Sequence, residues 1–284
     1  MIRNLLCCGL LLSVLIGCGQ NLPPAKTPLA AVHQKFIKIY EEEIKEAVVL
    51  KEIGQTLWIY LPMKENLIEV KAASQLKVDA KKPETKPVVR YLEGIFKNQS
   101  FHIDYDIASN KTYNKSYGYA SSYSEAYQNK QRRLFDALQR CYLEADLPPQ
   151  FIVYIIADTT NGVESENILY FKDLKEAMTV SQEEYLKRAI SELRGNPNIM
   201  DDAKGRHLKY VEITMPDFLM KQIINRVNFK YQRSSFPPAA DTVSEIKNIL
   251  TETFQAYEFR DFQSVELNDL DAGKTTTILR TELN

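Results

Sequence analysis

Two carboxylates on one short segment have a spacing that suits acid–base chemistry. Apolar and polar residues alternate over residues 101–107, which predicts a strand with one buried face, and Asp104 and Asp106 share its polar face with His102. Such a pair can act as general acid and general base when its surroundings separate the two pKa values. The same alternation is typical of a strand whose polar face meets water, and we favour this second interpretation.

The three histidines, His33, His102 and His207, are the residues best suited to bind a metal. They lie on separate predicted elements and form neither an HExxH nor a His-x-His spacing. A metal site needs several ligands clustered in space. We therefore expect each histidine to be solvated or to make a single hydrogen bond, and we predict no metal and no cofactor.

Cys141 is the remaining candidate nucleophile. It falls on the apolar stripe of a predicted helix, together with Leu134, Leu138 and Ala145, and that stripe holds no cation that would lower the thiol pKa. We therefore predict an inert thiol in the core. The sequence has no GxSxG segment, so no nucleophile elbow of that kind is expected.

Two turn-like segments near the C-terminus resemble ligand-binding loops incompletely. Residues 272–275 read like the end of a phosphate-binding loop, but Asn268 replaces the required glycine and a strand is expected to follow. Residues 269–271 read like the start of a calcium loop, but no glutamate follows at the twelfth position. We predict plain turns at both places, and we assign no catalytic residue.

The charge composition bears on the class of partner. The chain has 36 Lys and Arg against 37 Asp and Glu, a net charge of −1 with both signs interspersed. Nucleic-acid binders use a basic field to displace counterions, and none is visible, so no nucleic-acid partner is predicted. The hydrophobic share of 44% is enough for a substantial core.

The hydrophobic periodicity predicts an α+β fold of mixed helices and mostly antiparallel strands. Helices are expected over residues 28–53, 123–145, 182–194, 217–229 and 243–257. Strands are expected over residues 56–61, 101–107, 151–157, 168–171, 207–214, 262–267 and 275–283. The run 151–157 is apolar throughout, which is typical of a central strand buried on both faces.

The chain divides into two predicted α+β modules, residues 28–172 and 173–284. In each module, a proline closes an early strand. A later turn in each module has an Asp followed four residues on by a Gly, over residues 158–162 and 269–273. A duplicated module and a chance agreement of short patterns are both open interpretations. The first module carries a charged connector over residues 63–89 and a Tyr-rich insertion over residues 109–121.

The N-terminal residues 1–17 have the features of a signal peptide. Arg3 precedes an uncharged, mostly apolar run that ends at Gly17, whereas a membrane-spanning helix needs about 20 such residues. The succession Leu15, Ile16, Gly17, Cys18 resembles the lipobox of bacterial lipoprotein precursors. This resemblance implies cleavage before Cys18, a diacylglyceryl thioether on its sulfur and usually a further acyl chain such as palmitate on its amino group.

The lipid on Cys18 would be a permanent membrane anchor, because each buried methylene contributes about 0.8 kcal/mol and several chains act together. Residues 18–27 would then be the lipidated cysteine and its tether. In lipoproteins of bacteria with two membranes, Asp after the cysteine favours the inner membrane. Gly19 stands there in this chain, so we expect the outer membrane, facing the periplasm. An ordinary secretory signal with an incidental Cys18 is the alternative.

The body also resembles a family of uncharacterised bacterial lipoproteins. The similarity is carried by the short segments WIYLP, PPQF, NPNIMDD, ITMPDFL and VELNDL, which are spread over most of the chain. The resemblance implies envelope localisation and assigns neither an activity nor a site.

A tract of tyrosines is the candidate contact surface. Tyr113, Tyr117, Tyr119 and Tyr123 stand among Asn, Ser and Lys, and tyrosine offers a rigid ring with a hydroxyl for protein or glycan contacts. A surface-packed insertion is the alternative. The sequence therefore suggests a membrane-anchored binding or assembly component. The second hypothesis is an envelope hydrolase acting on glycan or peptide, and a pocket with two carboxylates about 5–10 Å apart would favour it.

Overall fold

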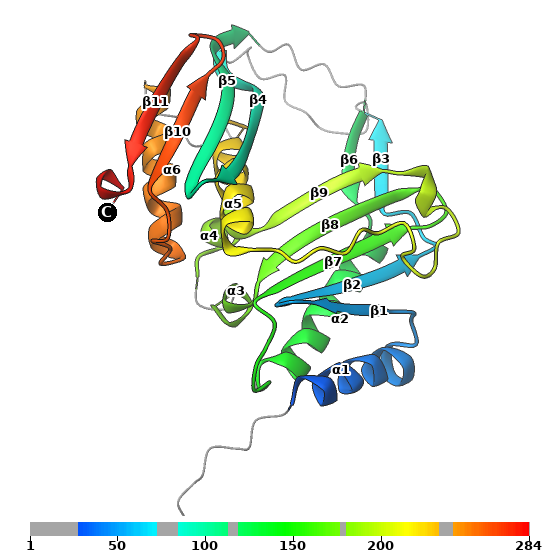
Figure 1. Ribbon diagram of the computed structural model, residues 1–284. Coiled ribbons are helices and arrows are strands. Elements are labelled where there is room, and N and C mark those ends of the chain that lie inside the picture. The colour runs from blue at the N-terminus through cyan, green and yellow to red at the C-terminus, as the bar shows by residue number, and fades with distance from the viewer. Residues whose placement is uncertain (1–27, 73–84, 113–118, 177–179, 233–240, 284) are drawn as a thin grey trace, which may run out of the picture.

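The structure is a computed structural model that describes residues 28–72, 85–112, 119–176, 180–232 and 241–283 (Figure 1). Helices and mostly antiparallel sheets are mixed along these ranges, which confirms the predicted α+β class. None of the helices in the described ranges is both long and apolar enough to cross a membrane. Residues 1–27, with Cys18, lie outside the described residues, as do Tyr113 and Tyr117.

A five-stranded sheet forms the larger half of the molecule. Its order is β1 (Val49–Ile53), β2 (Thr56–Met63), β7 (Phe151–Asp158), β8 (Val163–Tyr170) and β9 (Ile190–Gly195). Strands β2 and β7 are parallel, and the other neighbours are antiparallel. Every residue of β7 is buried, which confirms the predicted central strand.

Helices cover one face of this sheet, and an irregular segment crosses the other. The covering elements are α1 (Leu29–Lys38), a π-helical turn (Ile39–Ile44) and α2 (Glu125–Tyr142). On the opposite face, residues 200–214 follow a short 3₁₀ turn (Pro197–Ile199) and are held by side chains of β2. Trp58 Nε1 donates to the Val211 carbonyl at 2.8 Å, and Thr56 Oγ1 accepts from the Ile213 amide at 2.8 Å.

A second sheet of four strands has the order β11 (Lys274–Leu279), β10 (Ser264–Asp269), β5 (Ser100–Thr112) and β4 (Thr85–Lys97). Helices α5 (Met215–Gln232) and α6 (Thr242–Ala256) lie along one side of it (Figure 1), and a 3₁₀ turn (Arg280–Glu282) follows β11. A separate ribbon pairs β3 (Ile68–Ala72) with β6 (Tyr119–Tyr123). Buried and half-buried positions alternate along residues 101–107 of β5, which confirms the predicted strand with one buried face.

The two sheets share one arrangement, in which a hairpin lies parallel to a second hairpin. Strands β1–β2 and β7–β8 form it in the larger sheet, and β4–β5 and β10–β11 form it in the smaller one. The backbone contacts repeat as well: Gln55 O accepts from Gln150 N at 2.8 Å, and Gln99 O accepts from Gln263 N at 2.7 Å. Asp158 and Asp269 each accept two backbone N–H groups of the turn that follows.

The sheets nevertheless draw strands from both predicted modules. Strands β4 and β5 come from residues 28–172 but share the smaller sheet with β10 and β11, whereas β9 comes from residues 173–284 but extends the larger sheet. The ends of the predicted connector also belong to strands, since β3 and the start of β4 lie within 63–89. Likewise, residues 109–112 belong to β5 and residues 119–121 to β6, so both described ends of the predicted insertion belong to strands.

Several predicted elements are wrong because strand pairing overrides local periodicity. The first helical pattern stops at Ile44, where Lys45 has φ +58°, and Val49 pairs with Tyr60 in β1 instead. The helix expected over residues 182–194 ends at Arg188, and β9 follows. The strand expected over residues 207–214 is irregular. Helix α2 is capped by Ser124 instead of Ser122, because Ser122 is taken up by β6.

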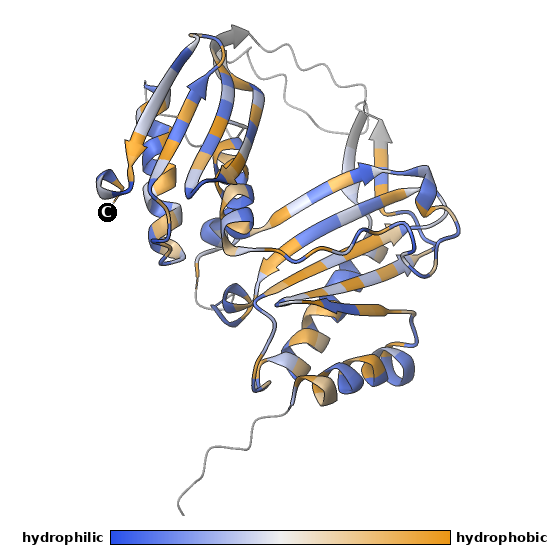
Figure 2. Cartoon of the chain, in the orientation of Figure 1, coloured by the Kyte–Doolittle hydropathy of each residue, from blue (hydrophilic) through white to orange (hydrophobic). Residues whose placement is uncertain are grey.

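Helix α5 joins the two sheets through a shared core. The ring of Phe218 lies 5.2 Å from that of Phe151 on β7 and 5.1 Å from that of Tyr257 after α6. Other buried residues on this side of the larger sheet belong to the same hydrophobic cluster as Phe101 and Val265 of the smaller sheet. Hydrophobic residues are concentrated on β7 and alternate along the strands of the smaller sheet (Figure 2). Each large apolar side chain buried here contributes roughly 1.5–3 kcal/mol.

Candidate functional site

A cavity of about 380 Å³ opens between α2, the strands β7 to β9 and α4 (Gln182–Arg188), next to α3 (Phe171–Glu176). Pockets of a few hundred Å³ with mostly apolar walls and a few polar groups are typical ligand sites. We call this cavity the aromatic pocket. Its lining is formed by Tyr123, Tyr127, Gln128, Gln131, Phe135, Tyr154, Asn167, Ile168, Leu169, Asp173, Val180, Tyr185, Leu186, Arg188, Ala189, Ile190 and Ser191.

A stacked pair of tyrosines forms one wall. The rings of Tyr123 and Tyr127 lie 4.3 Å apart with an interplanar angle of 14°. Tyr127 is held in the first turn of α2, where its backbone N–H donates to Ser124 Oγ at 3.1 Å. Tyr123 ends β6 and is partly exposed, whereas Tyr127 is buried. The pair therefore runs from the surface of the ribbon into the pocket.

A chain of hydroxyl and amide groups follows the stacked pair across β8 and β9. Tyr127 Oη lies 3.0 Å from Ser165 Oγ, and Asn167 Nδ2 donates to Ser165 Oγ at 3.1 Å. Ser191 Oγ lies 3.5 Å from Ser165 Oγ and 3.4 Å from Tyr123 Oη. The last two distances exceed those of a good hydrogen bond, so Ser191 is held more loosely than the others.

Tyr154 presents its hydroxyl from β7. Its oxygen accepts a hydrogen bond from Gln131 Nε2 at 2.8 Å, and its ring meets the edge of Phe135 at 5.8 Å. Burial raises the pKa of Tyr154 well above its ordinary value, so this hydroxyl stays neutral at physiological pH. Burial raises the pKa of Tyr127 and Tyr185 as well, and the aromatic walls are therefore uncharged.

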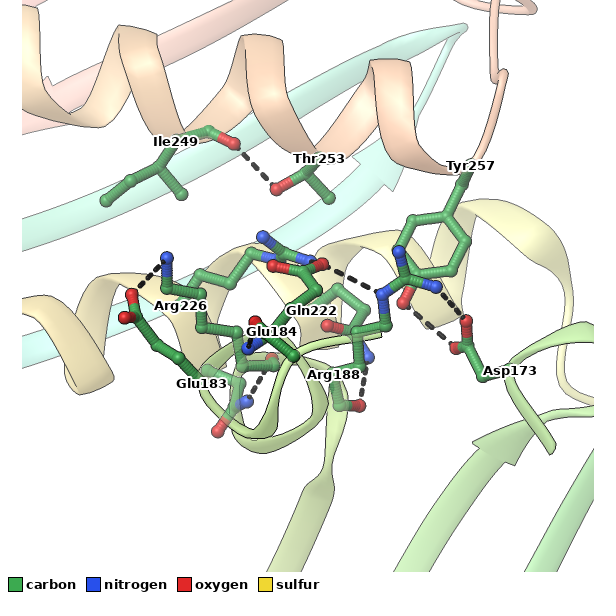
Figure 3. Close-up of polar contacts among 12 residues, drawn as sticks. Asp173, Glu183, Glu184, Arg188, Gln222, Arg226, Ile249, Thr253 and Tyr257 are labelled. Carbon is green, nitrogen blue, oxygen red and sulfur yellow. Dashed lines mark hydrogen bonds and ion pairs between the residues drawn. The ribbon is translucent and has the colours of Figure 1, made fainter. Parts of the chain in front are cut away.

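One edge of the pocket carries paired charges (Figure 3). Arg188 Nη1 lies 2.7 Å from Asp173 Oδ1, and Arg188 Nε donates to Glu184 Oε1 at 2.8 Å. The same Glu184 oxygen accepts from Arg226 Nη2 at 2.8 Å, and Tyr257 Oη donates to Asp173 Oδ2 at 3.1 Å. The network thus ties α3, α4 and α5 to the end of α6.

Burial sets the protonation of these carboxylates. It raises the pKa of Asp173, and the hydrogen bonds from Arg188 and Tyr257 offset part of that rise. Burial also opposes ionisation of Glu184, but hydrogen bonds from Arg188 and Arg226 outweigh it and leave the pKa of Glu184 lowered. Within the described lining, Asp173 is the single carboxylate, and it is already bonded to Arg188.

Asp104 and Asp106 do not form an acid–base pair. Asp104 accepts from Asn268 Nδ2 at 3.1 Å, whereas Asp106 is bonded to Arg90, whose Nη2 lies 2.6 Å from its Oδ1. Each carboxylate thus has a separate partner on the half-exposed face of the smaller sheet, and neither lines the aromatic pocket.

His207 corrects the expectation that every histidine would be solvated or singly bonded. It is buried, with Nδ1 at 2.7 Å from Asp202 Oδ2 and Nε2 at 3.0 Å from Glu164 Oε2. Glu164 lies on β8, so the contact depends on the fold of residues 200–214 across the sheet. His33 and His102 each have one carboxylate neighbour, Glu52 and Glu266.

The structure also shows the surroundings of the candidate metal ligands and of the Cys141 thiol. Among the described residues, no group of three or more His, Cys, Asp or Glu is placed to hold a metal. Cys141 is buried, as predicted, and burial raises the pKa of its thiol.

The predicted Tyr surface is placed only in part. Tyr123 lines the aromatic pocket, Tyr119 begins β6 with its side chain outside the description, and Tyr113 and Tyr117 lie outside the described residues. The sequence did not reveal Tyr127, Tyr154 and Tyr185 as site residues. They come from α2, β7 and α4, and each falls on an ordinary core-like stripe, so no local signal marks them.

Comparison of the chain with protein-family models, with curated proteins and with solved structures gave no match. The candidate function therefore rests on the aromatic pocket and on the resemblance of residues 15–18 to a lipobox.

Proposed function

We propose that this protein is a lipid-anchored component of the bacterial cell envelope that binds a ligand in the aromatic pocket. The observation that carries this proposal is the pocket itself. It is a cavity of about 380 Å³ lined by five aromatic side chains, neutral polar groups and the ion pair of Arg188 with Asp173. Preformed, mostly apolar cavities with few oriented polar groups suit binding. The Tyr-rich region contributes Tyr123 to this site.

The composition of the described lining favours binding over hydrolysis. Glycoside hydrolases commonly use two carboxylates about 5–10 Å apart, one of which must give and take a proton. Asp173 is the one carboxylate in the described lining, and its two oxygens are bonded to Arg188 and Tyr257. A carboxylate held in this way serves the connection between helices and is poorly placed to activate water.

The proposed anchor would hold the pocket close to a membrane. Residues 18–27 span at most about 30 Å when fully extended, and the described body begins directly after them. Gly19 after the lipidated Cys18 supports the outer membrane, facing the periplasm, as the site of attachment. The ligand or partner would accordingly belong to the envelope.

Native mass spectrometry of the full lipidated protein, extracted from its own envelope in mild detergent, tests this proposal. Ser191→Trp places an indole at the pocket, whereas Leu193→Trp places it two residues along the same strand face, at an exposed position outside the lining. We expect a bound mass that Leu193→Trp retains and Ser191→Trp loses. A wild type without bound mass, or a bound mass that survives in Ser191→Trp, would contradict the proposal.

A further inference from the structure

The charged groups at the aromatic pocket are paired within the protein. Arg188 contacts Asp173, Glu184 and Glu176, at 2.7, 2.8 and 3.1 Å, and Glu184 is shared with Arg226. A charged ligand would lose its hydration on entry and would have to compete with these contacts for a counter-charge. The lining therefore disfavours ligands with a carboxylate, phosphate or ammonium group inside the pocket.

The neutral polar groups of the inner pocket are largely occupied by one another. Tyr127 and Asn167 bond to Ser165 at 3.0 and 3.1 Å, and Tyr154 bonds to Gln131 at 2.8 Å. A ligand with many hydroxyl groups would have to break these contacts to satisfy its own. Ser191 differs, because its neighbours lie at 3.4 and 3.5 Å and its position on β9 is exposed.

Apolar side chains remain uncovered where the pocket opens. On α4, Tyr185 is 38% exposed and Leu186 is 36% exposed, and both belong to the lining. Phe135, Ile168 and Leu169 continue the apolar wall toward α2 and β8. Exposed apolar side chains at a cavity favour a ligand that covers them.

We infer that the aromatic pocket takes an uncharged, mainly apolar small molecule that places one hydroxyl or carbonyl group at Ser191. This inference rests on the proposed binding function and names the chemical class of its ligand. The apolar part of the molecule lies against the tyrosine pair and the aliphatic wall, and the polar group replaces the long contacts of Ser191.

Displacement of a fluorescent probe tests the inference. The protein is the mature chain from residue 18 with Cys18→Ser, which prevents lipid attachment, and the probe is the uncharged N-phenyl-1-naphthylamine. The competitors are decanol, decanoate and decylammonium, which share one chain length and differ in head-group charge. We expect the probe to bind, and we expect decanol to displace it at a concentration at least about tenfold lower than either charged analogue does. A tenfold ratio corresponds to about 1.4 kcal/mol of binding free energy.

Matched variants connect that result to the pocket. Ser191→Trp should abolish probe binding, whereas Leu193→Trp should leave it unchanged. Ser191→Ala should weaken displacement by decanol several-fold while probe binding is kept, because only the alcohol uses the serine hydroxyl. Equal potency of decanol in Ser191→Ala and in wild type would overturn the assignment of Ser191.

Other outcomes separate the ligand class from the binding function. Stronger displacement by decanoate or decylammonium, or by the neutral sugar N,N′-diacetylchitobiose, would overturn the uncharged apolar class. Absence of probe binding would overturn it too. If the native mass adduct is still lost in Ser191→Trp, the binding function stands and the ligand class alone fails; if no adduct exists either, both fail.

Discussion

The ring of Tyr123 stacks on the ring of Tyr127 at 4.3 Å, and this contact couples the β3–β6 ribbon to the first turn of α2. Tyr123 is the outer member of the pair and Tyr127 the buried one. The wall of the aromatic pocket nearest the Tyr-rich region therefore depends on a contact across the junction of β6 and α2, which follow each other in the chain.

Tyr123→Ala should lose the stacked pair, and Tyr123→Phe should keep it. Aromatic pairs contribute about 0.5–1.5 kcal/mol beyond burial, so we expect the alanine variant to lose about 1 kcal/mol of unfolding free energy and the phenylalanine variant much less. Urea unfolding measures both, and the probe titration should show weaker binding in Tyr123→Ala alone. Equal losses in the two variants would mean that the hydroxyl, rather than the ring, matters at this position, and two unchanged variants would mean that neither does.

Arg188→Met should be strongly destabilising. It would leave the buried Asp173 without its cation and Glu184 with Arg226 alone, and breaking a buried ion pair costs about 3–5 kcal/mol. The control is Arg194→Met, because Arg194 also pairs with glutamates but its side chain is 41% exposed against 14% for Arg188. Exposed pairs contribute about 0–1 kcal/mol.

Urea unfolding of a double variant provides an internal check of the Arg188–Asp173 ion pair. Adding Asp173→Asn to Arg188→Met removes the carboxylate that has lost its cation, so the double variant should recover part of the lost stability. Similar losses for Arg188→Met and Arg194→Met, or no recovery in the double variant, would show that the network does not stabilise the connection between the helices.

Asp202→Asn should destabilise the protein at neutral pH and have little effect in acid. Burial opposes ionisation of Asp202, but the hydrogen bond with His207 and backbone N–H groups, including that of Lys204, leave its pKa lowered. A lowered folded pKa means that the stabilisation is complete above the unfolded value of about 3.9 and is lost as pH falls through the folded value.

We therefore expect a loss of about 2 kcal/mol in Asp202→Asn near neutral pH, and convergence with wild type at about pH 2. Urea midpoints across this range measure the difference. The neighbouring exposed Asp201 provides the control, since Asp201→Asn should leave the pH dependence unchanged. A difference that stays constant down to about pH 2 would show that the carboxylate charge of Asp202 contributes no stability.

Cys18→Ser should block maturation of the N-terminus. If Leu15 to Cys18 act as a lipobox, the variant should accumulate as an uncleaved precursor and take up no labelled fatty acid, because the thiol that accepts the lipid is gone. Metabolic labelling and the mass of the product measure both effects, and Cys8→Ser within the proposed signal peptide serves as control. Normal processing of Cys18→Ser would rule out the anchor.

Local sequence patterns correctly predicted the elements whose buried residues recur at a regular period. The alternation of residues 101–107, the apolar run that became β7 and the stripes of α2 and α6 all predicted structures that formed, because burial on one face requires a matching period. The burial of Cys141 followed from the same stripe, and the inertness of its thiol stays a prediction. Anchoring through Cys18 stays a prediction of the sequence.

Tertiary structure alone decided the features that depend on long-range pairing. Val49 and Ile190 entered strands because Tyr60 and Ile168 offered backbone partners, although local periodicity favoured helices. His207 acquired Glu164 as a second carboxylate partner, beside Asp202 of its own segment, because that segment folds across β8.

The aromatic pocket has the same origin. Its tyrosines come from β6, α2, β7 and α4, and each of these segments hides an apolar face for its own packing. Hydrophobic periodicity reports which face of an element is buried, but the neighbour that covers it is set by sheet order and helix placement, which no local pattern encodes.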